Sequence, residues 1–166
     1  MSGFTVLHPS SDVTLVLSIL YGRTVADGVG VEVEVGDRSE RLLVSPAASR
    51  ILFLLAEAAH LDESNLGVRE RYRGYRATAV LAEAYSSLMN NRFPLHETVV
   101  RDHIKGIRRK VNQILSDFAR DGVNCPNKIE VIENKRTLGY RIANVRIVVS
   151  DAASGKAPPP PTPAPP

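Results

Sequence analysis

The chain has 166 residues, of which 43% are hydrophobic, so it is long enough to bury a core of its own. Its only cysteine is Cys125, which excludes an internal disulfide and an all-cysteine metal site. The longest apolar run, residues 51–56, is too short to span a bilayer, and the first twelve residues lack the basic start and apolar stretch of a signal peptide. We therefore expect a cytoplasmic protein with no membrane partner.

The net charge of +3 is unevenly distributed along the chain. Residues 1–66 hold four basic and nine acidic side chains, whereas residues 67–166 hold 17 basic and nine acidic ones. An acidic half followed by a basic half is typical of a protein whose second half meets a polyanion such as nucleic acid. A solvated basic surface without any partner gives the same pattern.

The first 44 residues predict a flexible terminus, residues 1–12, followed by a small antiparallel meander. Residues 13–20 are β-branched and apolar, as in a strand. Residues 31–35 alternate strictly between valine and glutamate, which predicts a strand with one buried face. Residues 41–44 form one more short strand in this interpretation, and glycine-containing turns separate the three segments.

Ser45 and Pro46 are a strong helix start, because Ser caps the first turn and Pro suits the first helical position. We expect this helix to reach about His60. Its predicted buried stripe is Ile51, Leu52, Leu55, Ala58 and Ala59.

Residues 61–76 are polar and contain four arginines and two tyrosines. They form either a basic loop or a partly helical insertion. Such a mixture can grip a nucleic-acid backbone, but exposed loops of this composition are common.

A second helix is predicted over residues 77–88, and residues 89–94 break it. Its predicted apolar face is Val80, Leu81, Ala84 and Tyr85.

A long third helix is predicted from about Glu97 to Phe118. Its apolar residues recur at spacings of four and three, which is the pattern of one buried helix face. This core stripe is Val100, Ile104, Ile107, Val111, Ile114 and Phe118.

The chain then predicts a loop over residues 121–127 and two strands, residues 129–132 and 140–149. Residues 133–139 join these strands into a β-hairpin with a basic tip. We expect residues 13–149 to form one domain and residues 150–166 to be a disordered tail, because seven of the 11 prolines lie in its last ten residues. This tail either binds a proline-recognising partner or acts as a linker.

The predicted order is meander, three helices and hairpin, which is the α+β plan of a winged helix-turn-helix domain. The DNA major groove admits one α-helix, and a recognition helix needs an apolar face for its own domain and a polar, basic face for DNA. The third helix has such a second face about 110° from its core stripe. It is formed by Arg101, Lys105, Arg108 and Asn112, with Arg109 and Lys110 beside it. A solvated basic face remains the alternative.

Two segments of the basic half resemble one known family. Residues 103–111, HIKGIRRKV, resemble the recognition-helix motif of OmpR/PhoB-type effector domains of response regulators, roughly V-H-I-R-R-L-R-K-K-L. Residues 132–141, IENKRTLGYR, resemble the wing of that family, roughly I-x-T-V-R-G-V-G-Y-R. The resemblance covers about residues 40–147, and the preceding meander is similar to the family's N-terminal sheet.

The resemblance implies that the third helix enters the major groove and that the wing lies at the adjacent minor groove. It also implies that residues 89–96 take the place of a loop that can contact RNA polymerase. Together, the helix face and the resemblance predict the DNA-binding residues Arg101, His103, Lys105, Arg108, Arg109, Asn112, Asn134, Lys135, Arg136 and Tyr140. For His103, a packed side chain at the edge of the apolar face is the alternative.

The sequence also departs from the family. Gly106 stands where the family often has Arg, so the base preference should differ, and Thr98 stands where some members have Arg. We expect no receiver domain, because residues 1–44 are too few for a phosphoacceptor fold.

No glycine-rich phosphate loop, metal-ligand cluster or Ser/His/Asp spacing is present, so we expect no enzyme, no cofactor and no metal. The sequence therefore predicts a bacterial-type transcription regulator that binds double-stranded DNA. The alternative is a winged helix that binds protein, either RNA polymerase or a regulatory complex. Since one module buries limited surface on DNA, we expect a homodimer or cooperative tandem binding through the N-terminal strands.

Overall fold

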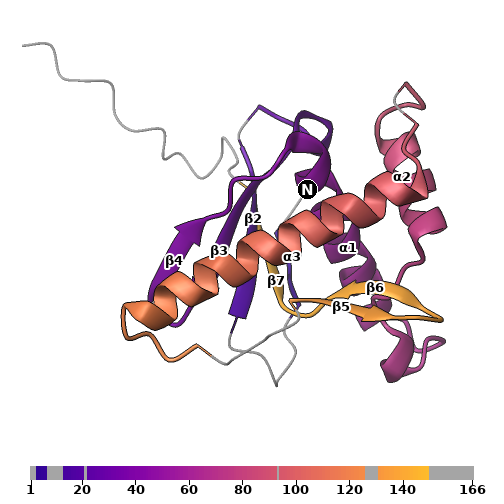
Figure 1. Cartoon of the computed structure of the whole chain (residues 1–166). Coiled ribbons are helices and arrows are strands. Elements are labelled where there is room, and N and C mark those ends of the chain that lie inside the picture. Colours follow the sequence, from indigo (N-terminus) through magenta and orange to yellow (C-terminus); the bar gives the residue numbers. More distant parts are fainter. Residues whose placement is uncertain (1–2, 7–12, 21, 93, 126–130, 150–166) are drawn as a thin grey trace, which may run out of the picture.

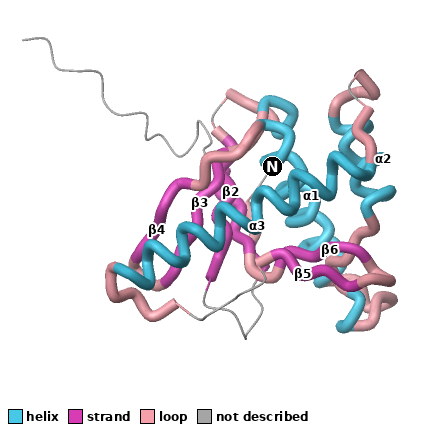
Figure 2. Tube along the Cα trace, in the orientation of Figure 1, coloured by secondary structure: helices cyan, strands magenta, loops and turns pink. Residues whose placement is uncertain are grey.

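The structure is a computed structural model that describes residues 3–6, 13–20, 22–92, 94–125 and 131–149. These residues form an α+β arrangement of three α-helices, a five-stranded sheet and a two-stranded sheet (Figure 1). Helix α3 crosses in front of the larger sheet, whereas α1 and α2 lie on the right of the view, as the colouring by secondary structure also shows (Figure 2).

The larger sheet has the strand order β1-β7-β2-β3-β4. Strand β2 (Val13–Ile19) pairs antiparallel with β3 (Gly30–Val35), and β3 pairs antiparallel with β4 (Arg38–Arg41). The predicted meander is therefore confirmed. Its third strand was expected at residues 41–44 but begins three residues earlier, because Gly36 adopts a φ of 56° and closes a two-residue turn in which Val35 pairs with Arg38.

Two segments join this sheet that the sequence analysis did not assign to it. Strand β1 (Thr5–Val6) lies within the terminus expected to be flexible, and it pairs antiparallel with β7 (Val145–Val149). The Phe4 ring next to it stacks on His60 with 4.1 Å between the ring centroids. Strand β7 in turn pairs in parallel with β2. Residues 1–2 and 7–12, like the predicted tail at 150–166, lie outside the described residues.

The expected strand at residues 140–149 is divided in two by a buried bend at Ala143 and Asn144. Its first part is β6 (Gly139–Ile142), which pairs with β5 (Ile132–Lys135) in a separate hairpin. Of the other predicted strand, residues 129–132, the first two lie outside the described residues, and only Ile132 belongs to β5. The chain therefore leaves the hairpin at the bend and enters the large sheet as β7.

Helix α1 (Pro46–Glu63) begins where predicted, with the Ser45 hydroxyl accepting a hydrogen bond from the Ala48 amide at 3.2 Å. All five residues of its predicted stripe are buried. Phe53, Leu54 and Ala56 are buried as well, because α1 is packed against α2, α3, β6 and β1. Helix α1 is thus the central helix of the domain.

Helix α2 (Thr78–Leu88) agrees with the prediction in extent but only in part in its buried face. Leu81 and Tyr85 are buried, whereas Val80 is 48% exposed, so its assignment to the apolar face was wrong. Ala82 is buried instead. The helix packs mainly against α1 and α3, and Val80 points away from both.

Helix α3 (Glu97–Arg120) confirms the predicted core stripe completely, since all six residues are buried, together with Leu115. The helix continues two residues past Phe118. No helix within the described residues is long and apolar enough to cross a membrane.

The segment between α1 and α2 is attached to the hairpin by its backbone. It contains a short 3-10 helix, Glu70–Tyr72, and then Arg76 pairs with Tyr140 of β6 through two backbone hydrogen bonds of 2.9 Å. Gly139 makes this approach feasible. It has a φ of 97°, and a Cβ atom added to it would lie 2.1 Å from the Arg76 carbonyl oxygen.

We predict that Gly139→Ala lowers the free energy of unfolding by more than about 2 kcal/mol, because the added methyl group meets backbone that has no room to move. Urea denaturation followed by circular dichroism measures this. The matched control is Gly106→Ala in α3, because a Cβ atom added at Gly106 has no atom within 4 Å. This variant should raise the free energy of unfolding by about 1 kcal/mol. Equal stability of the wild type and Gly139→Ala would contradict the close approach.

Candidate nucleic-acid interface

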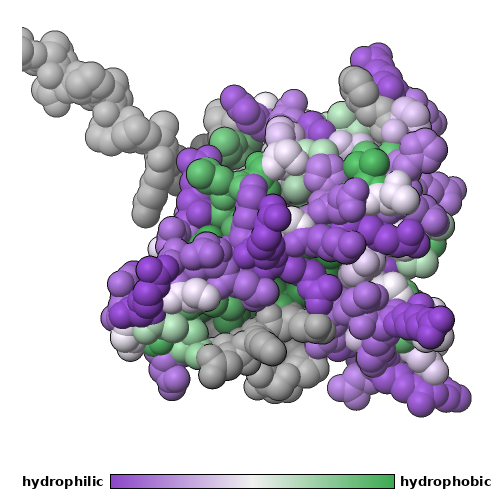
Figure 3. All heavy atoms as spheres, in the orientation of Figure 1, coloured by the Kyte–Doolittle hydropathy of each residue, from purple (hydrophilic) through white to green (hydrophobic). Residues whose placement is uncertain are grey.

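The outward side of α3 carries most of the predicted DNA-binding residues. Arg101, Lys105, Arg109 and Asn112 are exposed, and Arg108 is half-buried. They lie outward because the apolar stripe of the same helix is held in the core. Each residue of an α-helix is turned about 100° around the axis from the one before, so residues between the stripe positions point away from the core. Hydrophilic side chains cover the surface along α3 (Figure 3).

A groove brings four of these side chains together. It has a volume of about 640 Å³ and lies between α3 and the start of the β5–β6 hairpin. Its polar lining from α3 includes Lys105, Arg108, Arg109 and Asn112, and its other side is formed by Val131 and Ile132. The structure therefore places the predicted helix face and the first residue of β5 side by side.

Arg101 lies outside this groove and is tethered at the N-terminal end of α3. Its guanidinium donates a 3.3 Å hydrogen bond to the Thr78 hydroxyl of α2 and lies 3.9 Å from the Glu97 carboxylate. The side chain is 48% exposed, so it links α2 to α3 while keeping part of its cationic surface in solvent.

His103 and Lys110 belong to the other flank of α3. His103 is half-buried, and its position on the helix is about 160° from that of Arg101. The Lys110 ammonium donates a 2.6 Å hydrogen bond to the Leu43 carbonyl after β4. The structure thus separates His103 from the groove, and Lys110 connects α3 to the chain before α1.

The hairpin presents three of its four predicted residues to solvent: Asn134 and Lys135 are exposed in β5, and Arg136 is exposed in the turn that follows. Tyr140 is different. Its side chain is only 8% exposed and belongs to the hydrophobic core, while its backbone pairs with Arg76. Tyr140 therefore anchors the hairpin and leaves little surface for a DNA contact.

Tyr75 lies under the hairpin, and sequence reasoning did not place it in the site. Its hydroxyl donates a 2.8 Å hydrogen bond to Glu133 of β5. The Lys135 ammonium and the Arg141 guanidinium lie 5.1 and 4.5 Å from the centroid of its ring. Glu133 also forms an ion pair with Arg141. These contacts orient both strands of the hairpin relative to the segment before α2.

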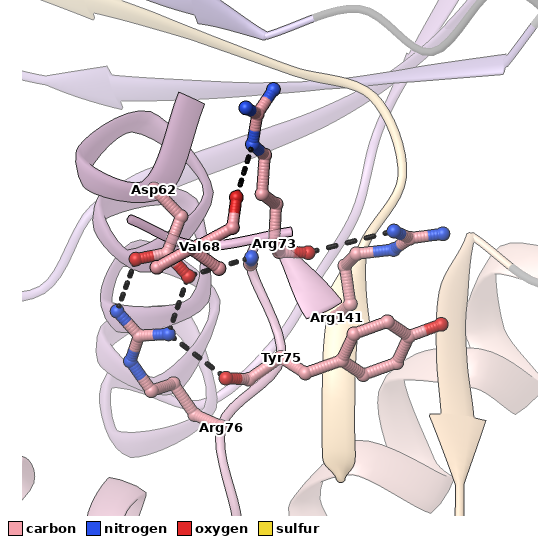
Figure 4. A network of polar contacts seen from close by, with 7 residues as sticks. Asp62, Val68, Arg73, Tyr75, Arg76 and Arg141 are labelled. Carbon is pink, nitrogen blue, oxygen red and sulfur yellow. Dashed lines mark hydrogen bonds and ion pairs between the residues drawn. The ribbon is translucent and has the colours of Figure 1, made fainter. Parts of the chain in front are cut away.

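Asp62, at the end of α1, organises that segment (Figure 4). Its buried carboxylate accepts hydrogen bonds from both terminal nitrogens of Arg76, at 2.7 and 3.0 Å, and from the Gly74 amide at 2.8 Å. The hydrogen bond from Arg76 is the main cause that lowers the pKa of Asp62, and the same contact raises the pKa of Arg76. The pair joins α1 to the residue that bridges to β6.

The basic segment 61–76 therefore uses half of its arginines internally. Arg76 is bound to Asp62, and the Arg73 Nε donates a 3.2 Å hydrogen bond to the Val68 carbonyl. Arg69 and Arg71 are exposed, and the Arg71 guanidinium lies 4.7 Å from the Tyr72 ring centroid. Composition alone could not distinguish these two roles, because the fold of the segment decides which arginines reach Asp62 or a backbone carbonyl.

Between α2 and α3, residues 90–92 form a polar turn. Asn90 and Asn91 both adopt left-handed backbone conformations, with φ of 54° and 59°, and are exposed together with Arg92. Phe93 lies outside the described residues.

The described residues contain no group of three or more His, Cys, Asp or Glu side chains that could hold a metal ion. Comparison of the chain with protein-family models, curated proteins and solved structures finds no match. Function is therefore inferred from the geometry and charge of the surface formed by α3 and the hairpin.

We predict that Asp62→Asn lowers the free energy of unfolding by about 3 kcal/mol at neutral pH, because it leaves the Arg76 guanidinium without its counter-ion. The pKa of Asp62 in the folded chain lies below its ordinary value of 3.8, so the carboxylate stabilises the fold above that pH. This stabilisation is lost as the pH falls through the folded pKa.

Urea denaturation of both proteins between neutral pH and pH values below 3.8 measures this, and the difference in stability should shrink on acidification. Asp121→Asn is the control, because its ion pair with Arg38 is exposed and should contribute less than about 1 kcal/mol. A difference that stays constant with pH would contradict the role of the Asp62 carboxylate.

Proposed function

We propose that the chain is a winged helix-turn-helix protein that binds double-stranded DNA and regulates transcription. In this proposal α2 and α3 form the helix-turn-helix, α3 enters the major groove, and the β5–β6 hairpin is the wing. The observation that carries the proposal is the groove in which Lys105, Arg108 and Arg109 lie with Asn112 beside the start of the hairpin.

The side chains along this face suit a duplex. Arg and Asn form bidentate hydrogen bonds to guanine and adenine edges, so Arg108 and Asn112 are the proposed base-reading residues. Lys105 and Arg109 are exposed cations that can neutralise phosphates on either side. Because the opposite side of α3 is fully buried, the helix has a single orientation in which to present them.

The hairpin supplies the second contact. Its turn presents the exposed side chains of Lys135 and Arg136, and we assign Arg136 to the adjacent minor groove. The strands below this turn are held by the Arg76–Tyr140 bridge and by Tyr75, so the turn is a fixed extension of the domain. The resemblance of residues 103–111 and 132–141 to OmpR/PhoB-type effector domains supports the same assignment of helix and wing.

The connection at residues 89–96, of which Asn90, Asn91 and Arg92 are exposed, is the proposed contact with RNA polymerase, by the same resemblance. It adjoins the N-terminal end of α3, whereas the groove extends along the helix from Lys105 to Ser116. Asn90 and Asn91, with their left-handed backbone conformations, form an exposed polar turn there. A protein that bound only to such a partner would have no use for the cationic groove, which is why DNA binding is the function we favour.

We predict that selection from a pool of random-sequence duplexes enriches a motif with the wild-type chain and a less specific one with Arg108→Ala. Loss of one bidentate contact should weaken binding to the enriched duplex by about ten- to a hundredfold. The control is Arg120→Ala, which removes an exposed arginine of the same helix that is paired with Asp117 and lies outside the groove. A wild-type chain that binds duplexes without enriching any motif would contradict sequence-specific recognition.

We also predict a steep dependence on salt. The slope of log Kd against log salt concentration should fall by about one for Arg109→Ala, which removes one phosphate contact, and should not change for Arg120→Ala. Fluorescence anisotropy with the enriched duplex measures it. Weak binding whose affinity is independent of salt would instead favour a winged helix that binds protein.

A further inference from the structure

Among the described residues, strand β4 forms one edge of the five-stranded sheet and pairs with β3 alone. All four of its residues, Arg38 to Arg41, are exposed. The strand lies on the left side of the sheet in Figure 1, away from the β5–β6 hairpin. Edge strands carry backbone hydrogen-bonding groups that point out of the sheet, so β4 offers a template for another strand.

The register of the β3–β4 pair shows which groups these are. Antiparallel pairs alternate between hydrogen-bonded and non-hydrogen-bonded residues. The Leu42 amide donates a 2.8 Å hydrogen bond to the Val31 carbonyl, so Glu40 and Arg38, at two and four residues from Leu42, also bond to β3. Ser39 and Arg41 therefore direct their backbone N–H and C=O groups away from β3, toward the open edge.

The charges along this edge change sign about Ser39: side chains at the same distance on either side of it carry opposite charges. Asp37 is acidic, Arg38 basic, Glu40 acidic and Arg41 basic. If a second copy of the strand is placed antiparallel with Ser39 opposite its own equivalent, Arg38 faces Glu40 of the other copy, and Asp37 faces its Arg41. Every charge then faces the opposite charge, and the outward backbone groups of Ser39 face one another.

Other registers lose this complementarity. A pairing centred on Glu40 places two glutamates opposite each other, and one centred on Arg38 or Arg41 places two arginines opposite each other. Like charges directly opposite on neighbouring strands are destabilising. The charge pattern thus selects one register among those that the geometry of the edge permits.

We propose that β4 is a self-association edge, through which two copies of this chain pair antiparallel about Ser39 and join their sheets into one. Such a contact is isologous and closes after two copies. Its length is short, so the dimer is weak and forms at high protein concentration.

The contact has a consequence for α3. The two-fold axis of an antiparallel pair within one sheet is perpendicular to that sheet, so both copies keep their helices on the same face. Helix α3 covers this face beside β4, where the Arg38 guanidinium lies 5.1 Å from the Phe118 ring centroid and 3.1 Å from Asp121. The cationic faces of both α3 helices are then on one side of the dimer; this consequence alone rests on the proposed DNA binding.

Charge reversal tests the pairing without DNA. Sedimentation equilibrium should show a concentration-dependent dimer for the wild type, with a Kd that rises about tenfold or more in R38E and in E40R, since each places two like-charged pairs across the interface. An equimolar mixture of R38E and E40R should regain the wild-type association, because each reversed side chain then faces the opposite charge. Thermal melts confirm that both variants are folded, as R38E also loses the contact with Asp121.

Ser39→Pro provides a second, independent variant. It removes the outward amide of Ser39 and leaves the β3–β4 hydrogen bonds in place, so it should abolish the dimer. Ser39→Thr is the matched control and should dimerise as the wild type does. A wild type that stays monomeric at every concentration, or single reversals that dimerise as well as the wild type, would overturn the proposal. E40R leaves the α3 groove untouched, so it should bind a duplex with one recognition site as well as the wild type does. Loss of the dimer with unchanged DNA binding then shows that the two proposals fail or hold independently.

Discussion

Burial of the apolar stripe of α3 is the constraint on which the rest of the surface depends. Val100, Ile104, Ile107 and Val111 are at most 1% exposed, so α3 cannot rotate about its axis without exposing large aliphatic side chains to water. Helical geometry then fixes where Lys105 and its neighbours along the groove point. The directions of the exposed side chains on α3 are thus a consequence of the packing of its buried side chains.

The hairpin depends on a different kind of constraint, which is polar and buried. Asp62 binds Arg76 and the Gly74 amide, and Arg76 carries the backbone bridge to Tyr140. A short hairpin is marginally stable alone, so it needs such attachment to hold its turn in place. Arg76, from the basic segment 61–76 that the sequence offered for nucleic acid, therefore helps to secure the β5–β6 hairpin. This hairpin presents Lys135 and Arg136.

Local patterns predicted the helices well and the sheet less well, for a physical reason. The Ser45 cap and the α3 stripe depend on residues within a few positions of each other, so periodicity and capping chemistry reveal them. The parallel pairing of β7 with β2, the bridge from Arg76 to Tyr140 and the burial of Tyr140 depend on partners that lie far along the chain. Val80 shows the same limit, since which side of α2 is covered is decided by the placement of α1 and α3.

A titration of the isotopically labelled chain with the enriched duplex, followed through its backbone amide NMR signals, tests the central claim most directly. Our account predicts that the amides of residues 101–112 in α3 and those of the hairpin turn at 135–138 shift together and saturate at the same duplex concentration. Shifts confined to the five-stranded sheet or to α1, with the amides of α3 unchanged, would contradict it.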